Sequence, residues 1–496
     1  MSKLIKKYLF LVIVFLCILV AFTYRSRFYW EFPPIEDNFD EFAYGWLGAS
    51  LIKTGIPTSW SFIPDYEKGY KKGMVLEVKD FRIEADGIVP NRDNYKIFPK
   101  PLTLAQEFTL DGYTSHFRIV SPYLEQPPLG GIIISLPLLG KVNDFQDASV
   151  RLLRYPFVVL GTVSVLLVVW LGSLLYSRLH GIVAGIIYAT APTVILGSRL
   201  ALPENILTPL ILLEVILLHY YRKKEKSLFL VLALAITFIA PLIKPFGLVC
   251  ALIGFGYLAI FKKDYKKGLL FVLSALGAVL VYVLYALSYD KNTFLWVLTY
   301  QSGRFFAGPS VFILKFIIPR ITKVFLDGWI LFGWISLFAI CLSRSVKKHT
   351  ELMIPIFSYL LVLLFFGGED YGWYRFPLYP FLIVAAAIMT IKIIAKPNFF
   401  SALTFLLVAP VTGFAWGLGI YNWMGYINYF RIFLTTSIAF SAITLFSDKK
   451  IVLRLTSIFL TLIFVSSLFL NTRVINNVRA IWAQLGDRSS LIIDRQ

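Results

Sequence analysis

The chain has 496 residues, of which 58% are hydrophobic, 17% aromatic and only 16% charged, and its mean hydropathy is +0.72. Soluble globular proteins are about 45–50% apolar and about a quarter charged. The composition is too apolar for a protein that folds in water, and too rich in large apolar side chains for a disordered one. It therefore excludes a water-soluble enzyme of several domains and predicts a chain that crosses a bilayer many times.

The charge is strongly basic, with 48 Lys and Arg against 29 Asp and Glu and a net charge of +19. In a polytopic membrane protein such residues gather in cytoplasmic loops, where anionic lipid attracts them. We therefore expect the lipid bilayer as a partner and no nucleic acid. The three cysteines lie in apolar runs without CxxC spacing and the four histidines are scattered. This pattern predicts no disulfide framework, metal site or cofactor, and it leaves a divalent metal open.

The first apolar run covers residues 8–23 and follows three lysines. It lacks a clear cleavage site and is followed directly by Arg25 and Arg27, so we expect it to be retained as the first span. A spanning helix needs about 20 apolar residues. The sequence therefore predicts an all-α polytopic membrane protein of about thirteen transmembrane helices. The further apolar runs are 152–176, 182–198, 205–221, 227–243, 245–261, 268–288, 322–343, 351–367, 376–395, 399–420, 430–447 and 451–470.

The short connections decide the orientation of these spans. Those on the same side as the N-terminus are all basic, and those on the other side are poorer in Lys and Arg. Because basic loops stay in the cytoplasm, the N-terminus is expected to be cytoplasmic. The compact loops favour a prokaryotic plasma membrane. The basic connections are 177–181, 221–226, 261–268, 343–350, 392–398 and 447–450.

Two long connections fall on the outer side, so any catalytic site is expected at that surface. The first is expected to form a mixed α/β loop domain, because the alternation over residues 74–89 predicts a short hairpin. The second has amphipathic character and is expected to lie along the interface. The predicted division is the first helix 1–24, the extracytoplasmic loop 25–150, transmembrane helices 151–288, the interfacial loop 289–321, C-terminal transmembrane helices 322–470 and a short tail 471–496.

An acidic cluster over residues 36–41 follows the first span and ends with Asp40 and Glu41. The helical pattern after it closes with Gly55 and Pro57, which places both carboxylates near a helix N-terminus at the bilayer surface. One interpretation is a helix cap, since Asp there contributes about 1 kcal/mol. The other is a general base that accepts a proton from an acceptor hydroxyl.

Three isolated cations, Arg199, Lys244 and Arg375, lie beside prolines at the predicted outer ends of spans. The positive-inside bias disfavours cations there. They either extend to the interface as single side chains or converge on an anion at the membrane surface, for which a lipid phosphate is the obvious candidate.

Four acidic residues are further candidates for a functional role. Glu204 falls in the same turn as Arg199, and Glu369 and Asp370 stand near Arg375. Glu214 falls inside a predicted span, where a carboxyl group is costly and often functional, although a hydrogen-bonded structural acid fits equally well. No phosphate-binding glycine loop or nucleophile elbow is placed where its mechanism would need it, which disfavours a nucleotide-binding enzyme.

The order of these features resembles a known family. The resemblance is to GT-C superfamily integral-membrane glycosyltransferases of the protein-mannosyltransferase, aminoarabinose-transferase and RgtA/B/C/D-like type, and it is clearest over residues 36–260. It weakens afterwards, apart from LIKPFG and WYRFPLYPFL. The segments that carry it are NFDEFAYGWLGASLIKTGIP, EQPPLGGIIISLPLL and the run from RLLRYPFVVL to GSRLALPENILTPL.

The resemblance implies a polyprenyl-phosphate or dolichyl-phosphate sugar as donor, an acceptor hydroxyl that attacks the sugar, and inversion at the anomeric carbon. Asp40 matches the family's catalytic aspartate, with Glu41 as its neighbour, and Glu204 matches an acidic position in the second outer loop. Lys244 and Arg375 match basic positions near the lipid phosphate. One base with cations on the phosphate is chemically coherent, because phosphate is already a good leaving group.

Arg199 completes the expected phosphate-binding set, and Gln126 marks a departure from the family pattern. Some relatives carry His or Lys before the proline pair, where this chain has Gln126. A glutamine donates a hydrogen bond but supplies no charge.

Two other function classes remain open. A flippase or transporter of a lipid-linked sugar would show inverted repeats and polar residues at the midplane, whereas here no repeat is visible and the polar residues gather at one face. An oligosaccharide ligase or polymerase would use a longer lipid-linked glycan, and the early acidic motif favours the simpler donor. The acceptor, whether protein, lipid or glycan, is not indicated.

Overall fold

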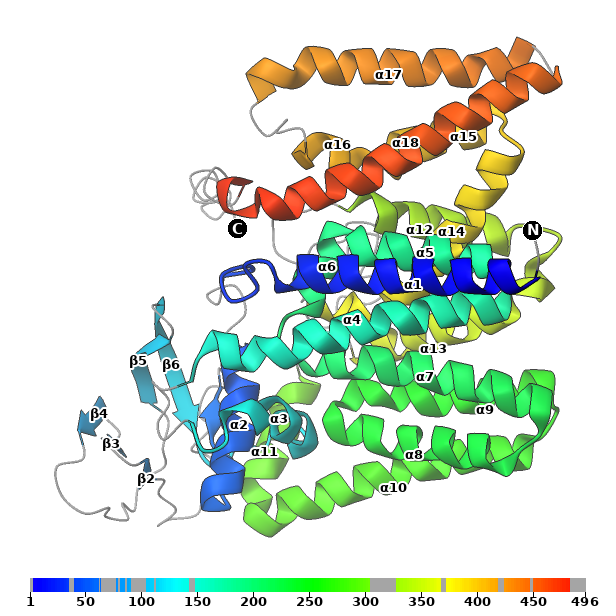
Figure 1. Cartoon of the computed structure of the whole chain (residues 1–496). Coiled ribbons are helices and arrows are strands. Elements are labelled where there is room, and N and C mark those ends of the chain that lie inside the picture. Colours follow the sequence, from blue (N-terminus) through cyan, green and yellow to red (C-terminus); the bar gives the residue numbers. More distant parts are fainter. Residues whose placement is uncertain are drawn as a thin grey trace.

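The computed structural model is a bundle of long helices with a small strand-bearing region at one end (Figure 1). It describes residues 3–34, 40–61, 63, 77–78, 81–84, 87–90, 104–110, 113–141, 148–303, 327–366, 372–417, 423–446 and 449–481.

The first half of the bundle contains α1 (Lys3–Ser26), α2 (Asp40–Thr54), α3 (Pro128–Ser135), η3 (Leu136–Leu138), α4 (Val150–Leu175), α5 (Arg178–Thr190), α6 (Pro192–Ser198), α7 (Pro203–Lys224), α8 (Ser227–Ile243), η5 (Pro245–Leu248), α9 (Val249–Phe261) and α10 (Tyr265–Tyr289). The second half contains α11 (Lys291–Ser302), α12 (Gly328–Cys341), η7 (Val346–His349), α13 (Thr350–Phe366), η8 (Gly372–Leu378), α14 (Tyr379–Ala395), α15 (Phe399–Val408), α16 (Val411–Gly417), α17 (Trp423–Phe446) and α18 (Lys450–Asn476).

Each of the predicted apolar runs contains a helix or a pair of helices, so the all-α polytopic prediction is confirmed. Within the described residues, eight helices are long and apolar enough to cross a membrane on their own. The pair α5 and α6 bends by 69° where Pro192 interrupts the helix, and it adds a ninth crossing if it forms one broken span rather than a re-entrant loop. The helices α8, α9, α12 and α17 are also apolar, but their apolar stretches are shorter than those of the eight spanning helices. The count of thirteen crossings therefore stays a prediction.

The proline-rich segment between α8 and α9 forms the tight hairpin that its sequence predicts. A Cβ added to Gly247 would lie 2.1 Å from the backbone carbon of Ala240, so the chain after the turn returns directly against the end of α8. Only glycine permits so close an approach of two backbones.

Three of the basic connections lie together at the end of the bundle that carries the N-terminus, opposite the strands (Figure 1). Tyr176, at the end of α4, bonds His349 of η7, with 2.9 Å between the phenol oxygen and Nδ1. Arg222, in the last turn of α7, forms an ion pair with Glu351 at the start of α13. The common location of these connections is what the predicted orientation requires.

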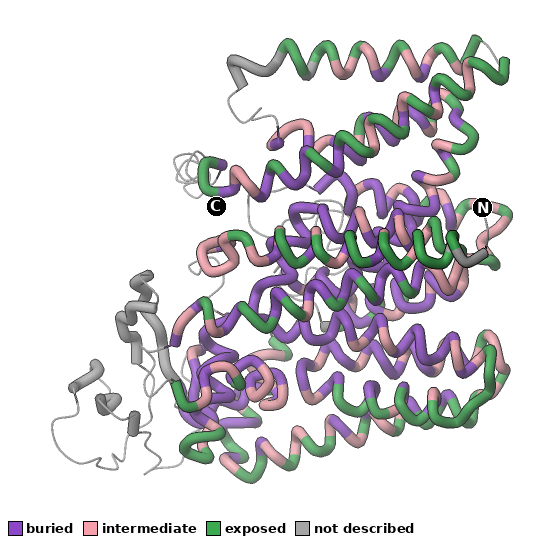
Figure 2. The backbone as a smooth tube through the Cα atoms, in the orientation of Figure 1, coloured by how far each residue is buried: buried purple, intermediate pink, exposed green. Residues whose placement is uncertain are grey.

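The interior of the bundle is formed by helices that are buried on nearly all sides. In the most apolar stretch of α7, 83% of residues are buried, against 17% in α1 and 22% in α10 and in α18. Figure 2 shows the same contrast between the inner and outer helices. Because the outer helices expose apolar side chains along their whole length, their free faces are suited to lipid contact.

The segment between α1 and α4 contains two antiparallel three-stranded sheets. The strands β2 (Glu77–Val78), β3 (Phe81–Glu84) and β4 (Gly87–Pro90) run in order, so the predicted hairpin is present with a third strand added. The strands β1 (Ser59–Trp60), β6 (Tyr113–Val120) and β5 (Leu104–Leu110) form the other sheet, in which β6 lies in the centre. The limits of the predicted loop domain stay a prediction.

In the second outer segment, α11 occupies the first part of the predicted interfacial loop, and residues 304–326 lie outside the described part of the chain. α18 continues to Asn476, beyond the end of its predicted run at residue 470, and Asn471 and Val474 are buried. The predicted tail therefore begins with helix, because this turn packs into the bundle.

Candidate active site

The acidic motif opens α2, with Asp40 as its first residue. α2 lies close against α3: a Cβ added to Gly48 would lie 2.1 Å from the carbonyl oxygen of Gly131. This contact fixes α2 against the segment that carries Gln126. Residues four apart share one face of a helix, so Asp40 and Tyr44 point to the same side.

Glu204 and Lys244 form a buried ion pair at the strand-bearing end of the bundle. Glu204 lies in the first turn of α7, and Lys244 is the residue that ends α8. Their side chains are 0% and 4% exposed. Only one carboxylate oxygen of Glu204 is bonded, since Oε2 has no hydrogen-bond partner. Among the described residues, the pair therefore keeps one buried acceptor atom unused.

The Lys244 ammonium also lies over aromatic rings from two other elements. It is 4.6 Å from the ring centroid of Tyr374 in η8 and 5.7 Å from that of Tyr44 in α2. Tyr374 is held in turn by the Tyr359 hydroxyl, which donates to its carbonyl oxygen at 2.6 Å. A single cation thus joins α2, α7, α8 and η8.

Tyr44 links Asp40 to this pair. Burial raises the pKa of the Tyr44 phenol well above its ordinary value of 10.0, and the negative charges of Glu204 and Asp40 raise it further. The phenol is therefore neutral, with a carboxylate on either side. We call Asp40, Tyr44, Glu204, Lys244 and Tyr374 the Tyr44 cluster.

Arg375 and Gln126 border the Tyr44 cluster. Arg375 follows Tyr374 directly and is buried in η8. Gln126 precedes α3, whose Gly130 approaches the carbonyl oxygen of Ile243, next to Lys244. The Gln126 Oε1 atom is buried without a hydrogen-bond partner. The structure therefore brings Asp40, Glu204 and Lys244 together, and it places the segments that carry Gln126 and Arg375 beside them.

Glu41 faces away from Asp40 and is fully engaged. Its carboxylate pairs with both ends of the Arg154 guanidinium, at 2.8 Å from Nε and 2.6 Å from Nη2, and both residues are 0% exposed. The backbone amide of Ala201 donates to the same carboxylate at 2.8 Å, and Arg154 donates to the Tyr29 carbonyl at 3.0 Å. Glu41 thereby connects the start of α2 to α4 and to the turn before α7.

Arg199 belongs with Glu41 rather than with Lys244. It is completely buried and donates from Nη1 to the Arg27 carbonyl at 2.7 Å, while Nε and Nη2 have no hydrogen-bond partner. Arg25 lies in the same region and donates from Nε to Ser198 at 2.9 Å. The sequence pattern missed Arg25 and Arg154 as buried residues, although an arginine inside an apolar run was the available signal.

Of the remaining acidic candidates, Glu214 does not join the Tyr44 cluster. Glu214 lies ten residues beyond Glu204 on α7, about 15 Å along the helix, and accepts a hydrogen bond from Thr237 at 3.1 Å. Glu369 and Asp370 lie outside the described residues. Within the described part of the chain, no group of three or more His, Cys, Asp and Glu is arranged to hold a metal ion.

Comparisons with known proteins show which family model and which solved structures this chain is similar to. Residues 125–286, about one third of the chain, match the family model for dolichyl-phosphate-mannose-protein mannosyltransferase. The crystal structure of ArnT from Cupriavidus metallidurans bound to undecaprenyl phosphate has the same fold, with a TM-score of 0.50, 11% identity, and coverage of 96% of this chain and 77% of that one. Residues 125–286 are therefore similar to that mannosyltransferase family, and the chain shares the fold of ArnT.

Two other solved structures give lower TM-scores with this chain than ArnT with undecaprenyl phosphate does. The archaeal oligosaccharyltransferase AglB from Archaeoglobus fulgidus, in complex with an inhibitory peptide and a dolichol-phosphate, gives a TM-score of 0.43 at 13% identity over 92% of this chain and 56% of that one. Apo ArnT from Cupriavidus metallidurans gives 0.43 at 11% identity, over 96% and 78%. None of the curated proteins matches the sequence significantly.

The resemblance stated from the sequence is thus confirmed, as is the GT-C-like helical fold. The matched segment contains Gln126, Glu204 and Lys244, whereas Asp40 and Arg375 lie outside it. The roles of the individual site residues stay predictions.

Proposed function

We propose that this membrane glycosyltransferase moves a sugar from a polyprenyl-phosphate or dolichyl-phosphate donor to an acceptor hydroxyl, with inversion at the anomeric carbon. The observation that carries the proposal is the Tyr44 cluster. It combines a half-buried carboxylate, Asp40, with a buried cation, Lys244, whose counter-ion keeps an unused oxygen. The undecaprenyl phosphate named for ArnT is a donor-type lipid of this chemistry.

In this mechanism Asp40 is the general base. The acceptor oxygen forms a bond to the anomeric carbon while the bond from that carbon to the phosphate oxygen breaks. The proton of the acceptor hydroxyl passes to Asp40, and the electron pair of the broken bond leaves with the lipid phosphate. Positioned proton transfer of this kind contributes about 10²–10⁴-fold to the rate.

Lys244 and Arg375 stabilise the departing phosphate, with Gln126 as an uncharged donor, whereas Arg199 lies with Glu41 and does not contact the phosphate in this proposal. Preorganised cations act strongly in a dry site because their orientation costs nothing at the moment of reaction. Glu204 holds the Lys244 ammonium in place.

Glu41 is a positioning residue in this proposal. Its contacts with Arg154 and Ala201 fix the start of α2. This fixes the direction in which Asp40, the preceding residue, points.

We place the active site on the extracytoplasmic face of a prokaryotic plasma membrane, with a cytoplasmic N-terminus. The support is the separation within the bundle: the basic connections at Arg222 and His349 lie at the N-terminal end, and the Tyr44 cluster lies at the other. Basic loops stay on the cytoplasmic side.

The test is transfer of radiolabelled sugar from a panel of polyprenyl-phosphate monosaccharides by the purified chain. Asp40→Asn is expected to lower the rate by about 10²–10⁴-fold while the protein still inserts and folds. The matched control is Asp264→Asn, because Asp264 also opens a helix, where it accepts from the Lys267 amide at 3.0 Å, but at the basic end. Near-normal transfer by Asp40→Asn would refute the base assignment, and lipid-linked sugar crossing liposomes unchanged would favour a transporter.

A further inference from the structure

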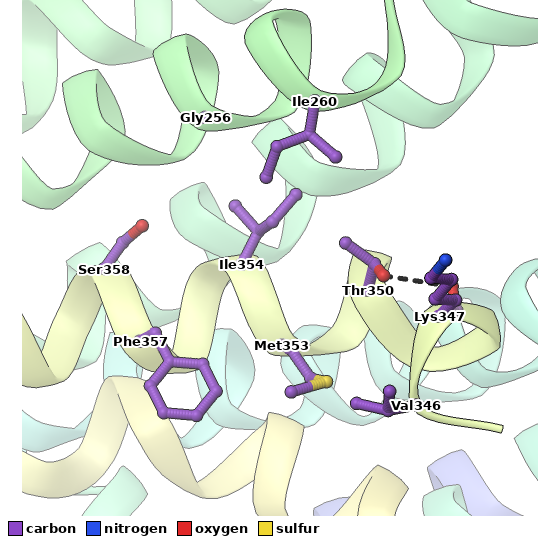
Figure 3. Close-up of a pocket in the computed structure, with 9 residues that line it drawn as sticks. All are labelled: Gly256, Ile260, Val346, Lys347, Thr350, Met353, Ile354, Phe357 and Ser358. Carbon is purple, nitrogen blue, oxygen red and sulfur yellow. Dashed lines mark hydrogen bonds between the residues drawn. The ribbon is translucent and has the colours of Figure 1, made fainter. Parts of the chain in front are cut away.

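A cavity of about 370 Å³ lies between α9 and α13, away from the Tyr44 cluster. Figure 3 shows Ile260 of α9 and Ile354 of α13 facing each other across it, and Gly256 lies in the same wall as Ile260. A Cβ added to Gly256 would meet only one side-chain atom, at 3.7 Å. The cavity therefore exists partly because this position of α9 carries no side chain.

The cavity is mostly apolar and carries its one cation, Lys347, at the end where α13 begins. Lys347 and Thr350 line one end of it, and Ile354, Phe357 and Ser358 follow at helical spacing. The Thr350 hydroxyl donates to the Lys347 carbonyl at 2.9 Å, which fixes the turn at the polar end. A ligand that fits this arrangement has an anionic end and an apolar body.

The apolar end is open to the exterior of the bundle. Ile260 is 48% exposed and Phe357 is 49% exposed. Both residues lie within apolar helices, so their exposed faces are suited to acyl chains rather than to water. The cavity can thus be entered from the lipid phase without a change of the fold.

The polar end lies among the basic connections. Lys347 and Lys348 precede α13, and Lys263 follows α9 within three residues of Ile260. These are exposed cations at the end of the bundle opposite the Tyr44 cluster. The start of α13 adds the positive end of its helix dipole, which attracts an anionic group.

We propose that this cavity binds an anionic phospholipid of the leaflet next to the basic connections. An acyl chain lies between Ile260 and Ile354, and the phosphate lies against Lys347 and the first turn of α13. The cavity volume falls in the usual range for ligand sites, about 300–1,000 Å³. The charge of Lys347 selects anionic over neutral lipid. The site is separate from the reaction and does not depend on the proposed donor.

The test reconstitutes the full chain into phosphatidylcholine vesicles that contain phosphatidylglycerol with a photoreactive group in its acyl chain. After irradiation, labelled peptides are mapped by mass spectrometry. Label is expected on α9 and α13, and Gly256→Leu is expected to abolish it by filling the cavity. Lys347→Gln is expected to weaken labelling about fivefold, and because Lys347 is exposed this variant keeps its fold.

Two variants serve as controls and should label as the parent does. Gly277→Leu makes the same exchange on α10, where an added Cβ would also meet only one side chain, that of Phe238, at 3.6 Å. Lys226→Gln removes an exposed cation from another basic connection. Unchanged labelling of Gly256→Leu would overturn the proposal, and so would equal labelling by a photoreactive phosphatidylcholine. Displacement by polyprenyl phosphate but not by unlabelled phosphatidylglycerol would also overturn it, because the carrier lipid would then be the occupant.

Discussion

Glu204 and Glu351 are both buried carboxylates that pair with a cation: Glu204 lies at the start of the inner helix α7, and Glu351 of α13 contacts the other end of α7. Glu204 stands in the first turn of α7, and Glu351 bonds His219, fifteen residues further on, about 22 Å away along the helix. Glu351 receives the Tyr257 hydroxyl and His219 Nδ1, each at 2.9 Å, and pairs with Arg222. Glu204 pairs with Lys244 alone.

The number of partners separates the two roles. A buried polar atom without a partner costs about 1–3 kcal/mol, and such atoms concentrate where a ligand or strain offsets the cost. Glu351 has contacts on both oxygens and acts as a tie between α7, α9 and α13. One oxygen of Glu204 is unused and lies next to a lysine. We therefore expect the ligand to bind at the Glu204 end of α7.

Among these buried carboxylates, the largest effect on transfer is expected from Glu204→Gln. Without its anchoring carboxylate the Lys244 ammonium loses its position, and a misplacement of about 1 Å at a reacting centre costs about 10²-fold. Transfer per folded molecule should therefore fall about 10²-fold, measured as kcat/KM for the donor on the monodisperse fraction.

Glu214→Gln is the matched control for this variant. Glu214 is a second buried acid on α7, and one of its oxygens also has no hydrogen-bond partner among the described residues. Its other oxygen accepts a hydrogen bond from the Thr237 hydroxyl and not from a cation. It should keep its specific activity. An equal loss in both variants would show that the cation next to Glu204 is irrelevant.

Glu351→Gln should give the opposite result, a loss of stability without a loss of specific activity. Glu351 accepts its hydrogen bonds as a charged carboxylate, and such bonds are worth about 1.5–3 kcal/mol each. In the variant, Arg222 would also lose its counter-ion. We expect the free energy of unfolding to fall by about 2–3 kcal/mol, measured by denaturant unfolding in detergent. Reduced transfer at unchanged stability would contradict the structural role.

The helices were predictable because runs of about 20 apolar residues have few alternatives in a bilayer. The bend at Pro192 was not, since proline in a spanning helix also occurs without a break. Likewise, the Glu41–Arg154 pair joins residues 113 positions apart. Nothing local in RLLRYPF distinguishes a buried arginine from one that reaches the interface.

The site could be predicted as a set of residues but not as a geometry. Asp40 and Glu41 are adjacent in the sequence, and successive residues of a helix point about 100° apart because a turn contains 3.6 residues. Helical spacing places Asp40 on the side of Tyr44, but the sequence could not tell which side of the helix meets Lys244 and which meets Arg154. Arg199 was grouped with Lys244 for a similar reason: both follow the pattern of a cation at the end of a span, but their neighbours come from different helices.

The smallest effect on stability is expected at an exposed ion pair in which both carboxylate oxygens are bonded. Glu31, after α1, accepts from Arg479, beyond α18, at 2.7 Å from Nε. The hydrogen bond from Arg479 holds the pKa of Glu31 below its ordinary value of 4.5. A lowered pKa means that the stabilisation is present above the ordinary value and is lost as the pH falls through the lowered one. Because exposed pairs contribute little, Glu31→Gln should lower the Tm only slightly at neutral pH.

That small difference should disappear at acid pH, where Glu31 is protonated in the parent protein as well. Arg479→Gln provides the control, because it also removes the contact between the guanidinium and the Phe28 ring, whose centroid is 4.1 Å away. This contact does not titrate, so the Arg479 variant should keep a residual Tm difference at acid pH. A pH-independent difference for Glu31→Gln would show that its ion pair is not the source. Equal Tm losses for Glu31→Gln and Glu351→Gln at neutral pH would break the rule that both partner number and burial decide the contribution of a carboxylate.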